Sequence, residues 1–348
     1  MNKHGGYFGE KTDTVIDFSV NVNPLGVPKK LIHHLSDRFV ELVRYPEIDG
    51  GKGKSLIAEY ENINEQEIII GNGATELIYL FTRAMRPKKA LIIQPTFTEY
   101  ERALKLVDCK VHNILTNPEN RFNINLNRLL SKIEEIKPDL IVLCNPNNPT
   151  GTFTHIEEFK IVLDKLKEIN ACLFLDESFI DFSNGSSYIS LINEYQIFII
   201  RSMTKIFAIP GLRLGYGVGN KELIFRLNKI KEPWTINSFA LNSIPILLKD
   251  YEYLEQTKKW YTKEKQYLFN ELKATENIYV YKSEANYFLC KLLKGSATKM
   301  KEDLLNENIY IRTCEDFYGL NHTYIRVAVR SHHENVKLIK ILNNYVQN

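Results

Sequence analysis

The sequence predicts an α/β protein with a mostly parallel, seven-stranded sheet in a large domain and a smaller α+β domain at the C-terminal end. Seven short apolar runs alternate with helical patterns from about residue 68 to 220. These runs are apolar almost throughout, which is typical of parallel strands covered by helices on both faces. After Pro233 the pattern changes to a long helical stretch followed by runs that alternate apolar and polar residues, as in a half-exposed sheet.

Each element follows from its local pattern. The expected strands of the large sheet are 67–70, 90–93, 110–114, 139–144, 171–176, 197–202 and 214–218. Apolar residues at three-to-four spacing predict helices at 74–85, 97–107 and 155–169. Beyond Pro233 we expect one helix over 236–275 kinked at Pro245, strands within 277–292, 308–314 and 323–330, and helices at 297–307 and 332–346. This predicts an N-terminal arm (1–40) packing with the small domain (241–348), and a large domain (41–240).

Composition and charge exclude several classes of protein. A net charge of +3 without a basic cluster argues against a nucleic-acid partner. No apolar run approaches the roughly 20 residues that span a bilayer, and residues 1–15 lack a signal-peptide pattern. The five cysteines are odd in number and never lie two residues apart, so we expect buried free thiols rather than disulfides or a zinc site. These features favour a cytoplasmic protein.

Polar residues follow three of the expected strands, where open parallel sheets bind ligands. Asn145-Pro-Asn-Asn-Pro-Thr-Gly151 follows 139–144, Asp176 closes the next strand, and 197–202 leads into Ser202-Met-Thr-Lys205 and then Gly211-Leu-Arg-Leu-Gly215. Each feature alone has an ordinary interpretation, since an aspartate often caps a helix and Asn, Pro and Gly form turns. In this order and spacing, they resemble the fold-type I aminotransferase superfamily, whose cofactor is pyridoxal 5'-phosphate (PLP).

The resemblance implies a cofactor site. Lys205 would form the Schiff base with PLP, helped by a crowded, partly cationic site that lowers the pKa of its amine. Asp176 would pair with the ring nitrogen and keep it protonated. The further cofactor contacts that it implies are Gly73, Ala74, Thr75, Ser202, Thr204 and Arg213 for the phosphate, Asn148 for the ring 3-oxygen, Phe97 for the ring face, and Tyr45 for the phosphate of the neighbouring subunit. The last contact implies a homodimer.

Other segments bear on the reaction. His4-Gly-Gly6, Asp17-Phe-Ser-Val-Asn-Val-Asn-Pro-Leu-Gly26 and Phe179, where many aminotransferases have tyrosine, resemble the threonine-phosphate decarboxylases of cobalamin biosynthesis. The resemblance covers nearly the whole chain. It implies decarboxylation of L-threonine O-3-phosphate to (R)-1-amino-2-propanol O-2-phosphate. No metal is implied, because the cysteine-rich tail of some relatives is missing.

The small phosphorylated substrate carries a phosphate and a carboxylate, which arginine binds best because its fork is bidentate. The resemblance makes Arg312 and Arg326 the substrate clamps, with His4 and Asn23 as further contacts. Arg330 shares a strand face with Arg326 at an even spacing. It is either a third substrate contact or a partner in a surface salt bridge.

Three alternatives remain. A histidinol-phosphate aminotransferase would have the same cofactor residues and also bind a phosphate monoester. A serine-phosphate decarboxylase producing ethanolamine phosphate differs by one methyl group, which a pocket discriminates by only ~1–3 kcal/mol. A PLP-binding regulator without turnover would need a DNA-binding domain, for which the chain has no spare length.

Overall fold

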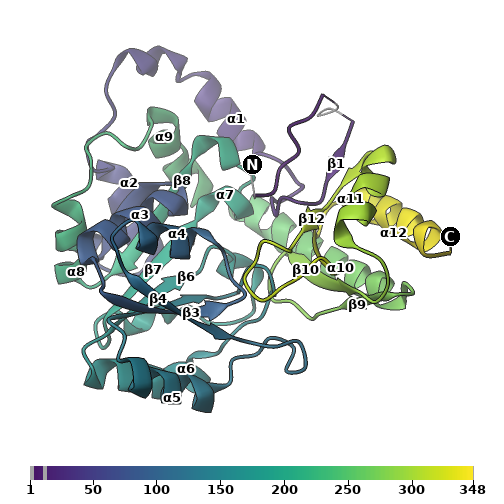
Figure 1. Ribbon diagram of the computed structural model, residues 1–348. Coiled ribbons are helices and arrows are strands. Elements are labelled where there is room, and N and C mark those ends of the chain that lie inside the picture. The colour runs from purple at the N-terminus through teal and green to yellow at the C-terminus, as the bar shows by residue number, and fades with distance from the viewer. Residues whose placement is uncertain (1–3, 11–13, 348) are drawn as a thin grey trace.

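The computed structural model describes residues 4–10 and 14–347, and a seven-stranded sheet lies between two helical layers (Figure 1). The strand order is β2-β8-β7-β6-β5-β3-β4. The strands are β2 (Ile68–Asn72), β3 (Lys89–Gln94), β4 (Lys110–Leu115), β5 (Leu140–Cys144), β6 (Cys172–Asp176), β7 (Ile197–Ser202) and β8 (Leu214–Gly219). Strands β4, β3, β5, β6 and β7 pair in parallel, whereas β8 is antiparallel to both β7 and β2. The predicted mostly parallel sheet is therefore confirmed.

Both faces of this sheet are covered, which explains the continuously apolar strands. Successive side chains of a strand point to opposite faces. In β3, Leu91 and Ile93 join one buried cluster, while Ala90 and Ile92 join the other. The first cluster includes residues of α1 (Lys29–Ser36), α2 (Gly51–Glu61), α5 (Leu126–Ile136), α6 (Ile156–Glu168) and α9 (Ser238–Leu247). The second includes residues of α3 (Gly73–Met85), α4 (Glu99–Lys105) and α8 (Lys221–Asn228).

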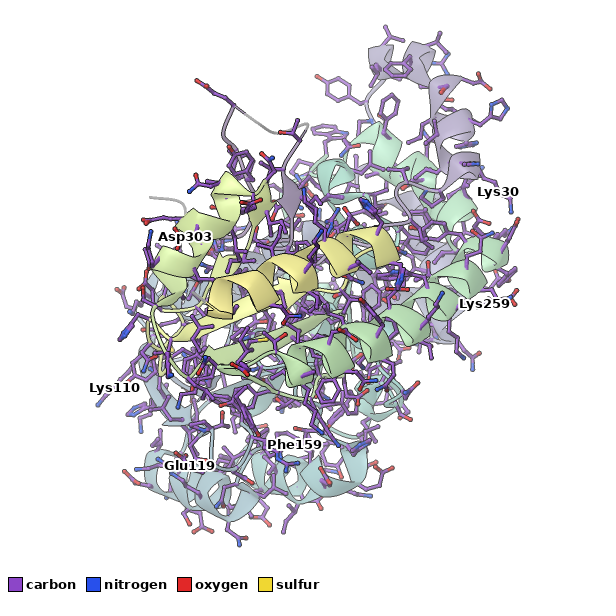
Figure 2. The ribbon with its side chains drawn as sticks, turned by 90° about the vertical axis from the view of Figure 1, so that its right-hand side faces the viewer. Lys30, Lys110, Glu119, Phe159, Lys259 and Asp303 are labelled. Atoms are coloured by element: carbon purple, nitrogen blue, oxygen red, sulfur yellow. The ribbon has the colours of Figure 1, made fainter. Side chains whose placement is uncertain are left out.

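A second, antiparallel sheet follows in the C-terminal part of the chain, with the order β12-β13-β10-β9. Its strands are β9 (Ile278–Val280), β10 (Tyr287–Leu292), β12 (Arg312–Thr313) and β13 (Tyr324–Ala328). Residues of α10 (Tyr251–Ala274), α11 (Ala297–Asn306) and α12 (His332–Gln347) form a buried cluster with this sheet. Figure 2 shows α10 and α12 side by side, with the labelled Lys259 and Asp303 directed outward. The predicted smaller α+β unit is thus present.

One predicted element is wrong. Residues 236–275 form two helices, α9 and α10, instead of one helix kinked at Pro245. Pro245 lies inside α9, and the break comes later, at residues 248–250. The buried Asp250 precedes α10 and pairs with Lys30 of α1 at 2.8 Å. This long-range ion pair holds the chain where the second helix begins, and local periodicity gives no sign of it.

The N-terminal arm joins the two parts of the chain. Its strand β1 (Ile16–Asp17) pairs in parallel with β11 (Ile309–Tyr310), and the Phe18 carbonyl accepts a hydrogen bond from the Ala328 amide at 2.9 Å. Further along, the Asn23 amide donates to the Lys205 carbonyl at 3.1 Å. The arm therefore runs from the small sheet to the segment that carries Lys205. The exact domain boundaries near 40 and 240 stay a prediction.

The remaining expectations concern cysteines and membranes. All five cysteines are free and buried, as predicted. Within residues 4–10 and 14–347, no helix combines the length and apolar character that a membrane crossing requires. The same described residues contain no group of three or more His, Cys, Asp or Glu side chains arranged to hold a metal ion.

Candidate active site

The ends of β6 and β7 bring Asp176 and Lys205 to one edge of the large sheet. Asp176 is the last residue of β6, and Lys205 lies in the short helix α7 (Met203–Ile206) that follows β7. The pKa of the Lys205 amine is lowered to about 8, chiefly by burial, with Arg213 and Arg326 acting in the same direction and Asp176 opposing them. Three predicted site residues therefore act electrostatically on Lys205. At pH 7 roughly a tenth of such amines is unprotonated, far more than at the ordinary lysine pKa of 10.5, so Lys205 can act as a nucleophile.

Asp176 is buried but retains acceptor capacity. Its Oδ2 accepts a hydrogen bond from the Tyr100 hydroxyl at 2.6 Å, and its Oδ1 accepts one from the Ser178 amide at 2.8 Å. Burial raises the pKa of this carboxyl, while the two hydrogen bonds and Lys205 act in the opposite direction. A carboxylate has about four lone-pair sites. Asp176 can therefore still accept a hydrogen bond from a protonated ring nitrogen.

The start of α3 forms a cradle for a phosphate group. Gly73 has a φ of 73°, and a Cβ placed on it would lie 2.5 Å from Nη2 of Arg213. The first amides of α3 receive no side-chain cap from the preceding residue, so they can serve an anion at this helix N-terminus. The Ser202 and Thr204 hydroxyls lie 2.8 Å apart, and Lys205 Nζ donates to Thr204 at 3.3 Å. Backbone amides, hydroxyls and a cation together match the chemistry of a phosphate monoester.

Asn148 is oriented by an arginine. Its Oδ1 accepts a hydrogen bond from Nη1 of Arg326, whose Nη2 donates to the Ser19 carbonyl at 2.7 Å. With Oδ1 engaged, Nδ2 of Asn148 is the amide atom available as a donor, as its predicted contact with the ring 3-oxygen requires. The Nε of Arg326 is buried and has no hydrogen-bond partner among the described residues. Arg326 therefore still has a donor to offer a ligand.

Two arginines face each other on the small sheet. Arg312 in β12 and Arg326 in β13 are direct partners in the antiparallel register. Arg312 donates to the Thr313 carbonyl at 2.7 Å and to Asp316 at 2.6 Å. Like charges directly opposite each other destabilise a sheet unless an anion compensates them. Asp316 compensates the charge of Arg312, whereas Arg326 has no carboxylate partner among the described residues.

Arg330 lies in a different setting from Arg326. The strand β13 ends at Ala328, so the even spacing that predicted a shared strand face does not extend to Arg330. Its guanidinium donates to Glu334 through Nε at 3.0 Å and Nη2 at 2.6 Å, and to the Asp17 carbonyl through Nη1 at 3.0 Å. These contacts fit the salt-bridge interpretation. Whether Arg330 also contacts substrate stays a prediction.

His4 and Asn23 approach the site from the arm. His4 Nε2 lies 3.0 Å from Oε1 of Glu99, and its ring centroid lies 5.6 Å from that of Phe97. Asn23 is buried, and its Nδ2 donates to the Ile206 carbonyl and to the Thr257 hydroxyl, both at 2.8 Å. One of these hydrogen bonds thus stabilises the segment next to Lys205, and the other joins the arm to α10. Substrate contacts by these two residues stay predictions.

Phe179 is surrounded by aromatic residues. Its ring meets that of Tyr287 edge-on at a centroid distance of 5.0 Å. The Tyr287 hydroxyl donates to the Asn147 carbonyl at 2.8 Å. Tyr287 therefore does not replace the tyrosine hydroxyl that many aminotransferases have at position 179. The ring centroid of Phe97 lies 5.7 Å from that of Tyr100 in α4.

Tyr45 lies apart from these residues within the chain. It is 84% exposed, and its ring lies 5.3 Å from that of Trp234. This location is compatible with a role in a neighbouring subunit.

The residues that sequence reasoning missed are Tyr100, Glu99 and Tyr287. In the helix expected over 97–107, Tyr100 would share a face with Phe97, three residues earlier; in the structure α4 begins only at Glu99.

The fold and the site agree with a comparison to known proteins. The sequence profile named "Aminotransferase class I and II" matches residues 13–343. The chain belongs to this family. A Salmonella typhimurium protein named threonine-phosphate decarboxylase is 32% identical, over 98% of this chain and 96% of its own. A Caldanaerobacter subterraneus protein, named provisionally for the same activity, is 39% identical over 98% and 93%. A histidinol-phosphate aminotransferase structure from Clostridium acetobutylicum has 34% identity and a TM-score of 0.89, covering 95% and 99%.

Membership in the class I and II aminotransferase family confirms the predicted fold-type I architecture and the resemblance to PLP-dependent enzymes. The chain is a PLP-dependent enzyme. The residues present fit this cofactor: an amine with a lowered pKa, a buried carboxyl that can accept a hydrogen bond, and a phosphate cradle at the start of α3. The roles of the individual residues stay predictions.

Proposed function

We propose that this enzyme decarboxylates L-threonine O-3-phosphate to (R)-1-amino-2-propanol O-2-phosphate, the linker of the cobamide nucleotide loop. The observation that carries the proposal is the facing pair of arginines, Arg312 and Arg326. A substrate with a phosphate and a carboxylate supplies two anions to such a pair. The full-length similarity to the Salmonella threonine-phosphate decarboxylase supports the same reaction.

The roles of the residues follow from their chemistry. When bound, the cofactor supplies an electron sink for the bond to Cα that stands perpendicular to its ring. Arg312 and Arg326 hold the anionic groups of the substrate and thereby decide which bond that is. They would hold the substrate so that the bond to its carboxylate carbon is the one that breaks; carbon dioxide would leave, and the bonding electrons would stay at Cα until a proton replaces it. Lys205, whose amine has a pKa of about 8, is suited to deliver the proton that replaces it at Cα.

Asp176 and Asn148 serve the cofactor rather than the substrate. Asp176 holds a proton on the ring nitrogen, and the Asn148 amide donates to the 3-oxygen. Phe179 leaves that oxygen without the tyrosine hydroxyl of many aminotransferases. This difference is consistent with a decarboxylase.

A second candidate is a histidinol-phosphate aminotransferase. The similarity to the Clostridium acetobutylicum structure, at 34% identity, favours it. Its amine substrate also carries a phosphate monoester but lacks a carboxylate. Its second substrate, 2-oxoglutarate, carries two carboxylates, so the products rather than the anions of the substrate separate the two candidates.

A product assay decides between them. Purified enzyme with PLP is offered L-threonine O-3-phosphate, L-serine O-phosphate and histidinol phosphate with 2-oxoglutarate in parallel. We expect carbon dioxide and aminopropanol phosphate from the first substrate. Glutamate formation from histidinol phosphate without carbon dioxide would select the aminotransferase. Faster release of carbon dioxide from serine phosphate would change the substrate to the smaller amino acid.

The proposal includes a homodimer in which Tyr45 reaches the cofactor phosphate of the neighbouring subunit. Exposed apolar side chains support it: Val40, Val43, Tyr45 and Ile48 lie close together in the sequence, and the Trp234 ring packs against that of Tyr45. Patches of this kind mark interaction surfaces in soluble enzymes.

We also propose a cytoplasmic location, which cell fractionation with an antibody against the chain would test.

A further inference from the structure

The Asp176 carboxylate has a partner that the cofactor motifs do not include. The Tyr100 hydroxyl donates to its Oδ2 at 2.6 Å, and both side chains are almost fully buried. A hydrogen bond to an ionised acceptor is shorter and stronger than a neutral one. This hydrogen bond is therefore a strong one, and burial keeps water from competing for either partner.

Tyr100 is held where it stands by its own packing. It lies in α4, its ring meets Phe97 edge-on at 5.7 Å, and Phe174 of β6 packs on it at 5.9 Å. Since Phe174 is two residues before Asp176 on the same strand, both side chains point to the same face of the sheet. The hydroxyl therefore meets the carboxylate in a fixed geometry.

We infer that Tyr100 is a positioning residue that holds the Asp176 carboxylate ionised and aimed at the ring nitrogen of PLP. The inference rests on the proposed role of Asp176 at that nitrogen. Asp176 has the Ser178 amide on Oδ1 and Tyr100 on Oδ2, so the carboxylate cannot rotate without losing both hydrogen bonds. Tyr100 does not touch the reacting atoms and acts through Asp176 alone.

The electrostatics of the pair agree with this role. Burial raises the pKa of Asp176, and the Tyr100 hydrogen bond is among the contacts that lower it. Burial also raises the pKa of Tyr100 well above its ordinary value, as does the nearby carboxylate. The phenol therefore stays protonated as a donor over the working pH range. Losing its hydroxyl would favour a protonated Asp176, which pairs poorly with a pyridinium.

The test compares Tyr100→Phe with the wild-type holoenzyme in the absence of substrate. Retention of PLP is measured by equilibrium dialysis and visible absorption between pH 5 and 9. We expect about tenfold weaker retention near neutral pH, as is typical for loss of a hydrogen bond to a charged group. The acid limb of the retention curve should move to higher pH, because a carboxyl without its donor is protonated more easily.

Two controls separate positioning from general loss of structure. Tyr195→Phe removes a tyrosine hydroxyl that donates to Asp164 at 2.7 Å, away from the site, and should leave the curve unchanged. In an Asp176→Asn background, Tyr100→Phe should cause no further loss of PLP. Thermal unfolding of the apoenzyme measures any structural effect directly.

An unchanged retention curve in Tyr100→Phe overturns the inference, as does an equal further loss in the Asp176→Asn background. These measurements use PLP alone. A wild-type enzyme that binds PLP but does not decarboxylate threonine phosphate would refute the proposed reaction and leave this test intact.

Discussion

Arg312 and Arg326 lie directly opposite each other on neighbouring antiparallel strands of the small sheet, with Arg326 almost fully buried. Burial lowers the pKa of Arg326, and the charge of Arg312 acts in the same direction. Arg312 is compensated by Asp316 at 2.6 Å, whereas no carboxylate of the described residues pairs with Arg326. An anionic substrate would supply the partner that Arg326 lacks.

Arg326→Lys keeps the positive charge but removes the planar fork. We expect kcat/KM for threonine phosphate to fall. The loss should correspond to about 2–5 kcal/mol of transition-state stabilisation, as is typical for a buried charged contact. Steady-state kinetics measure the change. The matched control is Arg226→Lys, which should cost less than about 1 kcal/mol because Arg226 lies exposed on α8, where it pairs with Glu222. Equal losses in both variants would contradict the special role of Arg326.

The lowered pKa of Lys205 predicts how fast the apoenzyme captures PLP. Only the unprotonated amine attacks the aldehyde, so the capture rate should rise with pH and level off above about 8. Stopped-flow absorption at several pH values measures it. Lys205→Ala should show no visible band of bound cofactor at any pH. A rate still rising at pH 10.5, the ordinary value for lysine, would show that the site does not lower the pKa.

Phe179→Tyr restores the hydroxyl that many aminotransferases have at this position. A hydrogen-bond donor to the ring 3-oxygen stabilises the negative charge on that oxygen. The oxygen then attracts the proton of the neighbouring imine nitrogen less strongly, and the pKa of that nitrogen falls. The pH at which the visible band of the bound cofactor changes should therefore move down. Absorption titration of the holoenzyme measures the shift. Tyr287→Phe is the control. Tyr287 packs against Phe179, but its hydroxyl donates to the Asn147 carbonyl. A titration that does not move would place position 179 out of reach of the 3-oxygen.

Gly73→Ala tests the phosphate cradle. The φ of 73° favours glycine, and the added Cβ would lie 2.5 Å from Arg213. An L-residue in this conformation costs about 1–2 kcal/mol, so PLP retention and the free energy of unfolding should both fall. Gly211→Ala is the control, because a Cβ there would meet nothing within 4 Å. If both variants retain PLP as the wild type does, the cradle has been assigned wrongly.

Val43→Asp tests the proposed dimer. Val43 is 86% exposed in the apolar surface beside Tyr45, and a carboxylate at its centre would have to be desolvated in an interface. We expect the variant to be monomeric in analytical ultracentrifugation and to retain less PLP. Ile161→Asp introduces the same charge at an exposed position of α6 and should leave the assembly unchanged. A monomeric wild-type enzyme would contradict the proposal.

The sequence by itself determined the seven strands of the large sheet and the resemblance from which the cofactor residues are predicted. Strands covered on both faces must be apolar throughout, so the seven runs were visible in the sequence. Lys205, Asp176 and Asn148 each follow a strand end, and parallel strands bring such ends to one edge. Local patterns therefore sufficed for these residues.

Only the tertiary structure decided what surrounds them. Beside the break before α10, Asp250 pairs with Lys30, and the two residues lie far apart in the sequence. The contact of Tyr100 with Asp176 joins residues of α4 and β6, and the pairing of Arg312 with Arg326 requires the register of β12 and β13. Distances across the fold set these relationships. Periodicity along the chain cannot specify them.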